Sequence, residues 1–180
     1  MPQARRLGLV QAHDLTLADW PLRTSLDWQD SHFIPFDFGY FAFIYDSRKV
    51  TKPATSLDAL INSDASIIYQ DPRTSTPGQG LMHWMQVVYG DEAEQAWQRL
   101  AANTVTVTKG WSEAYGMFLQ GEADYVLSYS TSPAYHQLVE ETHAYQATRF
   151  DEGHTAQVEV AAVSAYSDEP NWHRRFWFFC

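Results

Sequence analysis

The sequence predicts an α/β fold with one largely parallel sheet that helices cover on both faces. From residue 33 onward, β-like and helix-like segments alternate along the chain, and this alternation is typical of parallel sheets. Three of the β-like segments also end in turns that are rich in Ser, Thr or Gly and lead into helical patterns. These turns lie within residues 70–80, 108–115 and 128–135.

The first part of the chain is weakly patterned until a long strand begins. Residues 4–10 resemble the end of a helix that Gly8 stops, and residues 14–30 are expected to form a loop. Phe33–Tyr45 is rich in aromatic residues and alternates in its first half, which predicts a strand long enough to cross between two lobes. The alternative is a pair of strands with a bend at Gly39.

Periodicity and cap residues predict the remaining elements. Ser56 is expected to cap one helix, and Ser132 another that has Pro133 in its first turn. Gly90 and Gly121 are expected to end two further helices. The predicted helices cover residues 53–61, 81–90, 91–100, 111–120 and 133–141, and the predicted strands cover residues 67–69, 104–108, 125–129 and 157–163.

Composition and charge narrow the functional classes. A chain of 180 residues can hold one domain, or one domain and a fragment. The formal net charge of -10 argues against a non-specific nucleic-acid binder, which needs a basic face. The one cysteine, Cys180, permits neither an internal disulfide nor a cysteine-based metal site. The N-terminal residues lack the apolar core of a signal peptide, so the chain as given is expected to stay in the cytosol.

The three polar turns suggest a pocket for an aromatic ring and a phosphate. The start of a helix carries unpaired N–H groups and the positive end of its dipole, which suit an anion. Ser75 and Thr76 bring hydroxyls to the first turn, and Gly78 and Gly80 permit close backbone approach. Trp111 begins the next predicted helix, where it can face a crevice at the strand ends; burial in the core is the competing interpretation.

The third turn supplies two tyrosines, and its helix carries a possible metal pair. Tyr129 and Tyr135 can stack or donate a hydrogen bond. His136 and Glu140 are four residues apart and share a helix face, which could suggest a metal site. Helix surfaces often place such pairs by chance, and no nucleophile with a fixed partner is visible. We therefore predict neither a metal site nor an enzyme.

Longer segments around these turns resemble the periplasmic thiamine-binding proteins of bacterial ABC importers. The similar segments are YQDPRTSTPG at 69–78, TVTVTKGWSEAYG at 104–116 and SYSTSPAYH at 128–136. Residues 36–46, FDFGYFAFIYD, also resemble the strand that joins the two lobes in that family. The likeness extends from about residue 4 to about residue 170.

The resemblance implies a fold like that of the class II periplasmic binding proteins, with a ligand cleft between two lobes. Thiamine, its monophosphate or its diphosphate is then a transported ligand and not a cofactor. Trp111 resembles the ring-stacking residue, and Ser75 and Thr76 resemble contacts to the phosphate or hydroxyethyl end. The contacts from the opposite strand end correspond to Tyr129, Ser130, Thr131 and Ser132, with Tyr135 as a further aromatic wall. The implied partners are the permease and ATPase subunits of the importer, and the implied state is a periplasmic monomer.

The chain also departs from the family pattern. We expect residues 1–35 to be a remnant of the first lobe, 36–155 the second α/β lobe, 156–170 the returning strand, and 171–180 an atypical tail. The family's signal peptide and a first-lobe segment with ligand contacts have no counterpart upstream, so these residues alone are expected to bind thiamine poorly. One possible codon set for the tail, read one base earlier, encodes a family-like helix, ELAQKILVFL. A frameshift after Pro170 is therefore our hypothesis.

Three alternatives to thiamine transport stay open from the sequence. The first is a binding protein of the same fold for another ligand, such as ferric iron held by tyrosines. The second is a phosphate-handling enzyme, and the third is a gene remnant without function.

Overall fold

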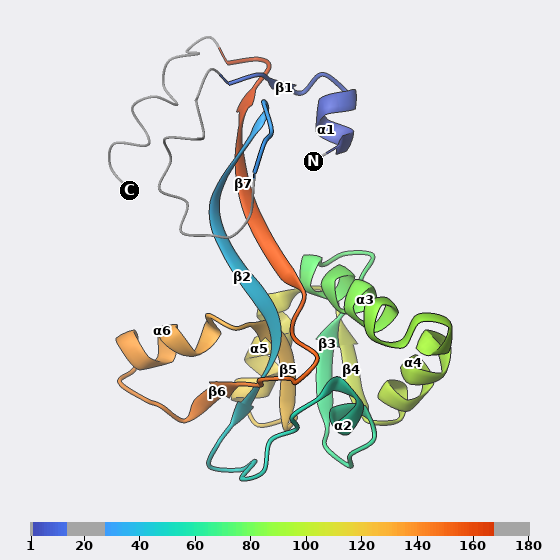
Figure 1. Cartoon of the computed structure of the whole chain (residues 1–180). Coiled ribbons are helices and arrows are strands. Elements are labelled where there is room, and N and C mark those ends of the chain that lie inside the picture. The colour runs from blue at the N-terminus through green and yellow to red at the C-terminus, as the bar shows by residue number, and fades with distance from the viewer. Residues whose placement is uncertain (1, 14–27, 168–180) are drawn as a thin grey trace. The chain divides into compact units, whose positions relative to one another are not determined.

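The computed structural model describes residues 2–13 and 28–167, and the chain divides into two compact units (Figure 1). The first unit contains residues 1–38 and 158–180, and the second contains residues 39–157. Most of the loop predicted over 14–30 and the whole tail predicted over 171–180 lie outside the described residues. The elements that are described alternate between helix and strand, as the α/β prediction requires.

The described part of the first unit consists of a short helix and three strand segments. Helix α1 (Pro2–Arg6) is stopped by Gly8 as predicted. Gly8 follows the helix with a positive φ of 64°, and its N–H donates to the carbonyl of Arg5. Strand β1 (Val10–Gln11) pairs antiparallel with β7 (Ala156–Ser164). In the strand order β7 lies next to β2 (Phe33–Asp46), and both β7 and β2 contribute residues to each unit.

Strand β2 is continuous over 14 residues, so the alternative of two strands with a bend at Gly39 is wrong. Gly39 has no positive φ, and the strand passes through it without a break. Side chains from Phe41 to Ile44 are all buried, because helices and strands cover this part of β2 on both faces. This complete burial explains why the sequence loses its alternation there.

The sheet of the second unit is mixed, and the prediction of a largely parallel sheet is wrong. Strand β3 (Ile67–Gln70) runs parallel to both β4 (Thr104–Thr108) and β5 (Tyr125–Tyr129). Strand β2 runs antiparallel to β5 and also to β6 (Tyr145–Ala147), which the sequence analysis missed. Alternation of hydrophobic residues reports burial and not strand direction, and three residues are too few to show a period.

The helices follow the predicted order, but several of their ends differ; the helix predicted over 81–90, for example, begins at Thr76. Ser56 caps as predicted, its hydroxyl accepting from the N–H of Ala59, but the helix begins only at Leu57. The predicted break near Gly90 is a short 3-10 helix, η2 (Gly90–Glu92). Thr131, and not Ser132, is the cap residue of the last helix. The bounds are α2 (Leu57–Ile61), α3 (Thr76–Tyr89), α4 (Ala93–Ala102), α5 (Trp111–Leu119) and α6 (Ser132–Val139).

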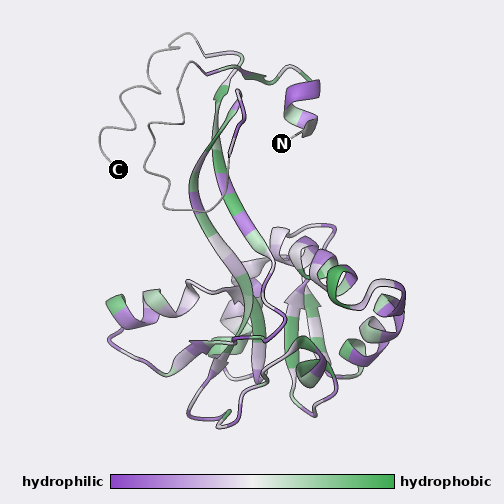
Figure 2. Ribbon diagram, viewed as in Figure 1, coloured by the Kyte–Doolittle hydropathy of each residue, from purple (hydrophilic) through white to green (hydrophobic). Residues whose placement is uncertain are grey.

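Helices cover both faces of this sheet, as predicted. Neighbouring residues of one strand point to opposite faces, and Tyr69 packs with side chains of α2, α3 and α4 while Ile68 packs with those of α5. The hydrophobic colouring runs along these strands, and the connecting loops are more hydrophilic (Figure 2). Within the described residues, no helix is long and apolar enough to cross a bilayer.

Candidate ligand-binding site

The three polar turns gather at one edge of the sheet in the second unit. Strands β5, β3 and β4 are neighbours in that order and run parallel, so their carboxyl ends meet at the same edge. Each strand leads into the start of a helix: β3 into α3, β4 into α5 and β5 into α6. The three turns therefore lie at one edge of the sheet, as the sequence argument for a shared crevice requires.

Hydrogen bonds join the three turns to one another. The hydroxyl of Thr74 in the first turn donates to the carbonyl of Lys109 in the second, at 2.7 Å. The indole Nε1–H of Trp111 in the second turn donates to Ser128 Oγ at the end of β5, also at 2.7 Å. A ligand at this edge would thus meet one connected surface and not three separate loops.

The indole of Trp111 is not packed inward. Trp111 is the first residue of α5 and is 37% exposed. One face of its ring stacks on Tyr115, with ring centroids 5.0 Å apart and an angle of 23° between the planes. The Ser128 hydroxyl that accepts from the indole is itself hydrogen-bonded to Ser132 Oγ at 2.7 Å. Core burial, the competing interpretation of this tryptophan, is therefore wrong.

The third turn presents hydroxyls and one strongly exposed ring. Ser130 and Thr131 are exposed, and the N–H of Ser130 donates to the carbonyl of Tyr40 on β2. Tyr129 is half-buried and its ring lies 5.5 Å from that of Phe41. Tyr135, on the first turns of α6, is 58% exposed. This end of β5 therefore offers polar groups and an aromatic surface together.

The first turn holds Ser75 and Thr76 at the start of α3, but its glycines have a different role from the predicted one. Ser75 is buried and Thr76 is exposed. A Cβ at Gly78 would lie 2.2 Å from the carbonyl oxygen of Gln70, and a Cβ at Gly80 would lie 2.1 Å from the ring of Phe41. Both glycines thus permit close packing against the chain's own strands, which explains them without a ligand.

The possible metal pair on α6 and the acidic Asp71 of the first turn are engaged with other side chains. His136 is buried, and its two ring nitrogens bond to Tyr115 and Glu140. The carboxylate of Asp71 pairs with the guanidinium of Arg73, which lowers the pKa of Asp71 to about 2. Among the described residues, no group of three His, Cys, Asp or Glu side chains is arranged to hold a metal ion.

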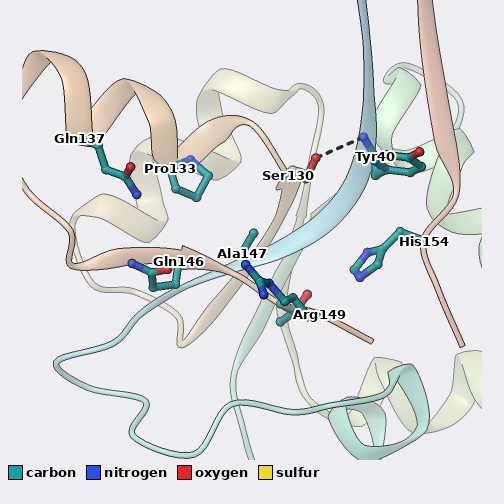
Figure 3. A pocket seen from close by; sticks show the side chains of 9 residues that line it. Tyr40, Ser130, Pro133, Gln137, Gln146, Ala147, Arg149 and His154 are labelled. Atoms are coloured by element: carbon teal, nitrogen blue, oxygen red, sulfur yellow. Dashed lines mark hydrogen bonds between the residues drawn. The ribbon is translucent and has the colours of Figure 1, made fainter. Parts of the chain in front are cut away.

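A cavity of about 450 Å³ borders the third turn within the same unit (Figure 3). Ser130 is the one predicted ligand residue that lines it. The positively charged side chain that lines the cavity belongs to Arg149. Within the described residues, this side chain has no hydrogen bond or ion pair. Its other lining residues are Tyr40, Pro133, Gln137, Gln146, Ala147, Thr148 and His154.

The imidazole of His154 is fixed as a neutral ring in the wall of this cavity. Its Nε2 accepts from the N–H of Phe150 at 3.0 Å, so the hydrogen is on Nδ1, which donates to the carbonyl of Phe41 at 2.8 Å. The ring therefore anchors the segment before β7 to β2.

Sequence reasoning missed two residues that hold Trp111, although the sequence contains a signal for each. Tyr115 lies four residues after Trp111 and hence on the same face of α5. Ser128 is a buried polar residue inside an apolar strand, and polar groups in such positions need a partner. Part of the cavity lining comes from β6 and the loop after it, where the sequence shows no pattern.

Comparisons with known proteins agree with this architecture. The family model of bacterial extracellular solute-binding proteins matches residues 10–171. The thiamine-binding periplasmic protein of Escherichia coli (strain K12) is 61% identical over 151 residues, which are 83% of this chain and 46% of that protein. The protein of the same name from Haemophilus influenzae (strain ATCC 51907 / DSM 11121 / KW20 / Rd) is 51% identical over 173 residues, which are 95% and 51% of the two chains.

A solved structure of a periplasmic thiamin binding protein shares the fold. It superposes with a TM-score of 0.90 at 52% sequence identity and covers 97% of this chain and 55% of that chain. The expected periplasmic-binding-protein-like fold is thereby confirmed. The chain spans about half the length of the relatives that it matches.

Proposed function

This chain belongs to the family of bacterial extracellular solute-binding proteins, and on that basis we propose that it serves as the substrate-binding component of an ABC importer for thiamine and its phosphate esters. The two curated relatives described above carry thiamine in their names. The eight predicted ligand residues all belong to the second unit. We assign some of them to the thiazolium ring of thiamine and others to its phosphate end.

The observation that carries the proposal is the half-open indole of Trp111. Its ring is backed by Tyr115 on one face and held by Ser128 at its edge, while 37% of the residue remains exposed. Thiamine contains a flat, positively charged thiazolium ring, and such a ring gains about 1–2 kcal/mol by stacking on an indole face. Trp111 is placed to provide that face.

The phosphate end of the ligand is assigned to the starts of α3 and α6. Both helices begin at the same sheet edge as Trp111 and present unpaired N–H groups together with hydroxyls. The assigned contacts are Ser75 and Thr76 on one side and Ser130, Thr131 and Ser132 on the other, with Tyr129 and Tyr135 as aromatic walls. Helix starts attract an ester phosphate and accept a neutral hydroxyethyl group, which fits binding of thiamine and of its esters.

The proposed setting is transport and not catalysis. The ligand-bound protein delivers thiamine in the periplasm to the permease and ATPase subunits of the importer, and it acts as a monomer. Neither a ferric-iron binding protein nor a phosphate-handling enzyme is favoured. Relatives at 51% and 61% identity are named for thiamine, whereas a ferric site or a phosphate-transfer reaction has no comparable support.

Calorimetric titration with thiamine tests the proposal on the 180-residue chain. We expect measurable binding, and we expect Trp111→Ala to weaken it about 5- to 30-fold because the stacking contribution is lost. Trp111→Phe should have an intermediate effect. Val87→Ala, at a position on α3 that is 66% exposed, is the control and should leave the affinity unchanged.

Two results would overturn the assignment. One is a thiamine affinity that does not respond to Trp111→Ala. The other is no thiamine binding together with a tyrosinate absorption band on addition of a ferric salt, which would favour the iron alternative.

A further inference from the structure

Behind Trp111 lies a column of stacked rings, none of which is among the predicted ligand residues. Tyr115 backs Trp111, and His136 in turn stacks on Tyr115 with centroids 5.8 Å apart and an angle of 16°. Tyr145 of β6 closes the column, 4.3 Å from His136. Tyr115 and His136 are only 7% and 1% exposed, so the column connects the exposed indole to the interior.

Hydrogen bonds hold the buried part of this column in one orientation. His136 Nδ1 lies 2.6 Å from Glu140 Oε2, and His136 Nε2 lies 2.9 Å from the hydroxyl of Tyr115. A carboxylate can only accept, so His136 Nδ1 donates to Glu140, while His136 Nε2 and the hydroxyl of Tyr115 share the second hydrogen bond. Burial raises the pKa of Tyr115, so its hydroxyl keeps its proton.

We propose that Tyr115 is a positioning residue for Trp111, and that His136 and Glu140 act through Tyr115 by holding its ring in place. The inference rests on the proposed function, in which the open face of Trp111 stacks on the ligand. The indole has two contacts that fix it, the Tyr115 ring behind it and the Ser128 hydroxyl at its edge. Fixing an aromatic side chain before binding lowers the entropy lost when the ligand stacks on it.

The inference also gives a role to the His136 and Glu140 pair. The spacing of these residues suggested a metal, yet both imidazole nitrogens are used within the column. A histidine at 1% exposure with both nitrogens bonded is a rigid support. The pair therefore supports Trp111 indirectly, by holding the Tyr115 ring that packs against it.

Fluorine NMR of the full chain tests the positioning role directly. The tryptophans are replaced by 5-fluorotryptophan, and the Trp111 resonance is assigned from its loss in Trp111→Phe. Tyr115→Phe keeps the ring and removes the hydroxyl bond to His136, so we expect the Trp111 resonance to shift or broaden. Glu140→Gln, at an exposed carboxylate, should shift the Trp111 resonance in the same direction by less.

The matched control is Tyr125→Phe. Tyr125 is 2% exposed, and its hydroxyl accepts from the N–H of Ala54. The substitution therefore removes the same atom and a partly buried hydrogen bond at the opposite end of β5. We expect this variant to leave the Trp111 resonance unchanged. A Trp111 resonance that is identical in wild type, Tyr115→Phe and Glu140→Gln would overturn the inference, as would an equal disturbance by Tyr125→Phe.

Thiamine titration of the same variants separates this inference from the proposed function. We expect Tyr115→Phe to raise the dissociation constant about three- to tenfold and Tyr125→Phe to leave it unchanged. Absence of thiamine binding in the wild-type chain would count against the proposed function alone, since the fluorine spectra still decide whether Tyr115 positions Trp111. Binding that is intact in Tyr115→Phe would count against the positioning role alone.

Discussion

Trp111 owes its exposure to its place on α5. The buried side chains of this helix are Ala114, Tyr115 and Phe118, which face the sheet. Trp111 is one turn before Tyr115, and side chains in a helix point back toward its N-terminus. The indole therefore extends beyond the buried stripe toward the strand ends, where it can meet a ligand.

Asp71 shapes the first turn through both its backbone and its carboxylate. Its carbonyl accepts from the N–H groups of Thr74 and Ser75, and its side chain accepts from the backbone and the guanidinium of Arg73. These charge-assisted bonds favour the ionised carboxylate. The geometry of the turn that carries Ser75 therefore depends on the charge of Asp71.

The first prediction concerns the titration of Asp71. Its pKa in the folded chain is about 2, because of the hydrogen bonds from Arg73, whereas an unfolded Asp titrates near 3.9. A lowered pKa means that the stabilising contribution is complete above about pH 3.9 and is lost as the pH falls toward 2. NMR titration of the side-chain carboxyl carbon measures this value, and Arg73→Gln should move it upward. A pKa near 3.9 in the unsubstituted chain would contradict the prediction.

Helix α3 packs closely against the end of β3 at two glycines. Gly78 allows the helix to lie against the backbone of Gln70, Asp71 and Pro72, and Gly80 allows it to lie against Phe41. Neighbouring atoms of the backbone cannot move aside as a flexible side chain can. Close packing at this junction fixes where the first turn of α3 meets the sheet edge.

The second prediction compares one substitution at two glycines. Gly78→Ala should lower the free energy of unfolding by about 1–3 kcal/mol, since the new methyl group overlaps the Gln70 carbonyl. Gly116→Ala, inside α5 with open space around the position, should raise it by about 0.5–1 kcal/mol through helix propensity. Urea unfolding monitored by circular dichroism measures both. Equal effects of the same sign at the two positions would refute this account of Gly78.

The 180 residues correspond to about half of the proteins that they resemble. A bound ligand gains affinity from every surface that excludes water around it, and an opposite charge near a cationic ring adds several kcal/mol when it is buried. The described residues of the proposed site supply the stacking ring and the helix starts. In the relatives, about half of the length lies outside the segment that matches this chain.

The third prediction follows from this comparison. The 180-residue chain should bind thiamine more weakly than the Escherichia coli relative measured alongside it by calorimetry. A chimera in which residues 39–157 replace the matching segment of that relative should restore tight binding, because the eight proposed ligand contacts of this chain lie within residues 39–157 and the rest of the relative is kept. Submicromolar binding by the 180-residue chain would contradict the first expectation, and a chimera that folds without binding would contradict the second.

Local patterns were enough to predict most of the elements and their order. The strands at 104–108 and 125–129 have the predicted bounds, and α5 begins at Trp111 as expected. The local patterns also predicted that the three polar turns share one sheet edge, and they do so because the strands before them are parallel. The eight ligand residues themselves stay a prediction that the thiamine titrations test.

Tertiary structure decided what depends on contacts between distant segments. The direction of β2, the pairing of the three-residue β6 and the tight contact of Gly80 with Phe41 all arise from partners that lie far away in the sequence. The sequence also left Trp111 open between core and crevice, and its orientation is determined by Tyr115 on the same helix together with Ser128 on β5. Hydrophobic periodicity records whether a side chain is buried, and only the folded chain determines which group it meets.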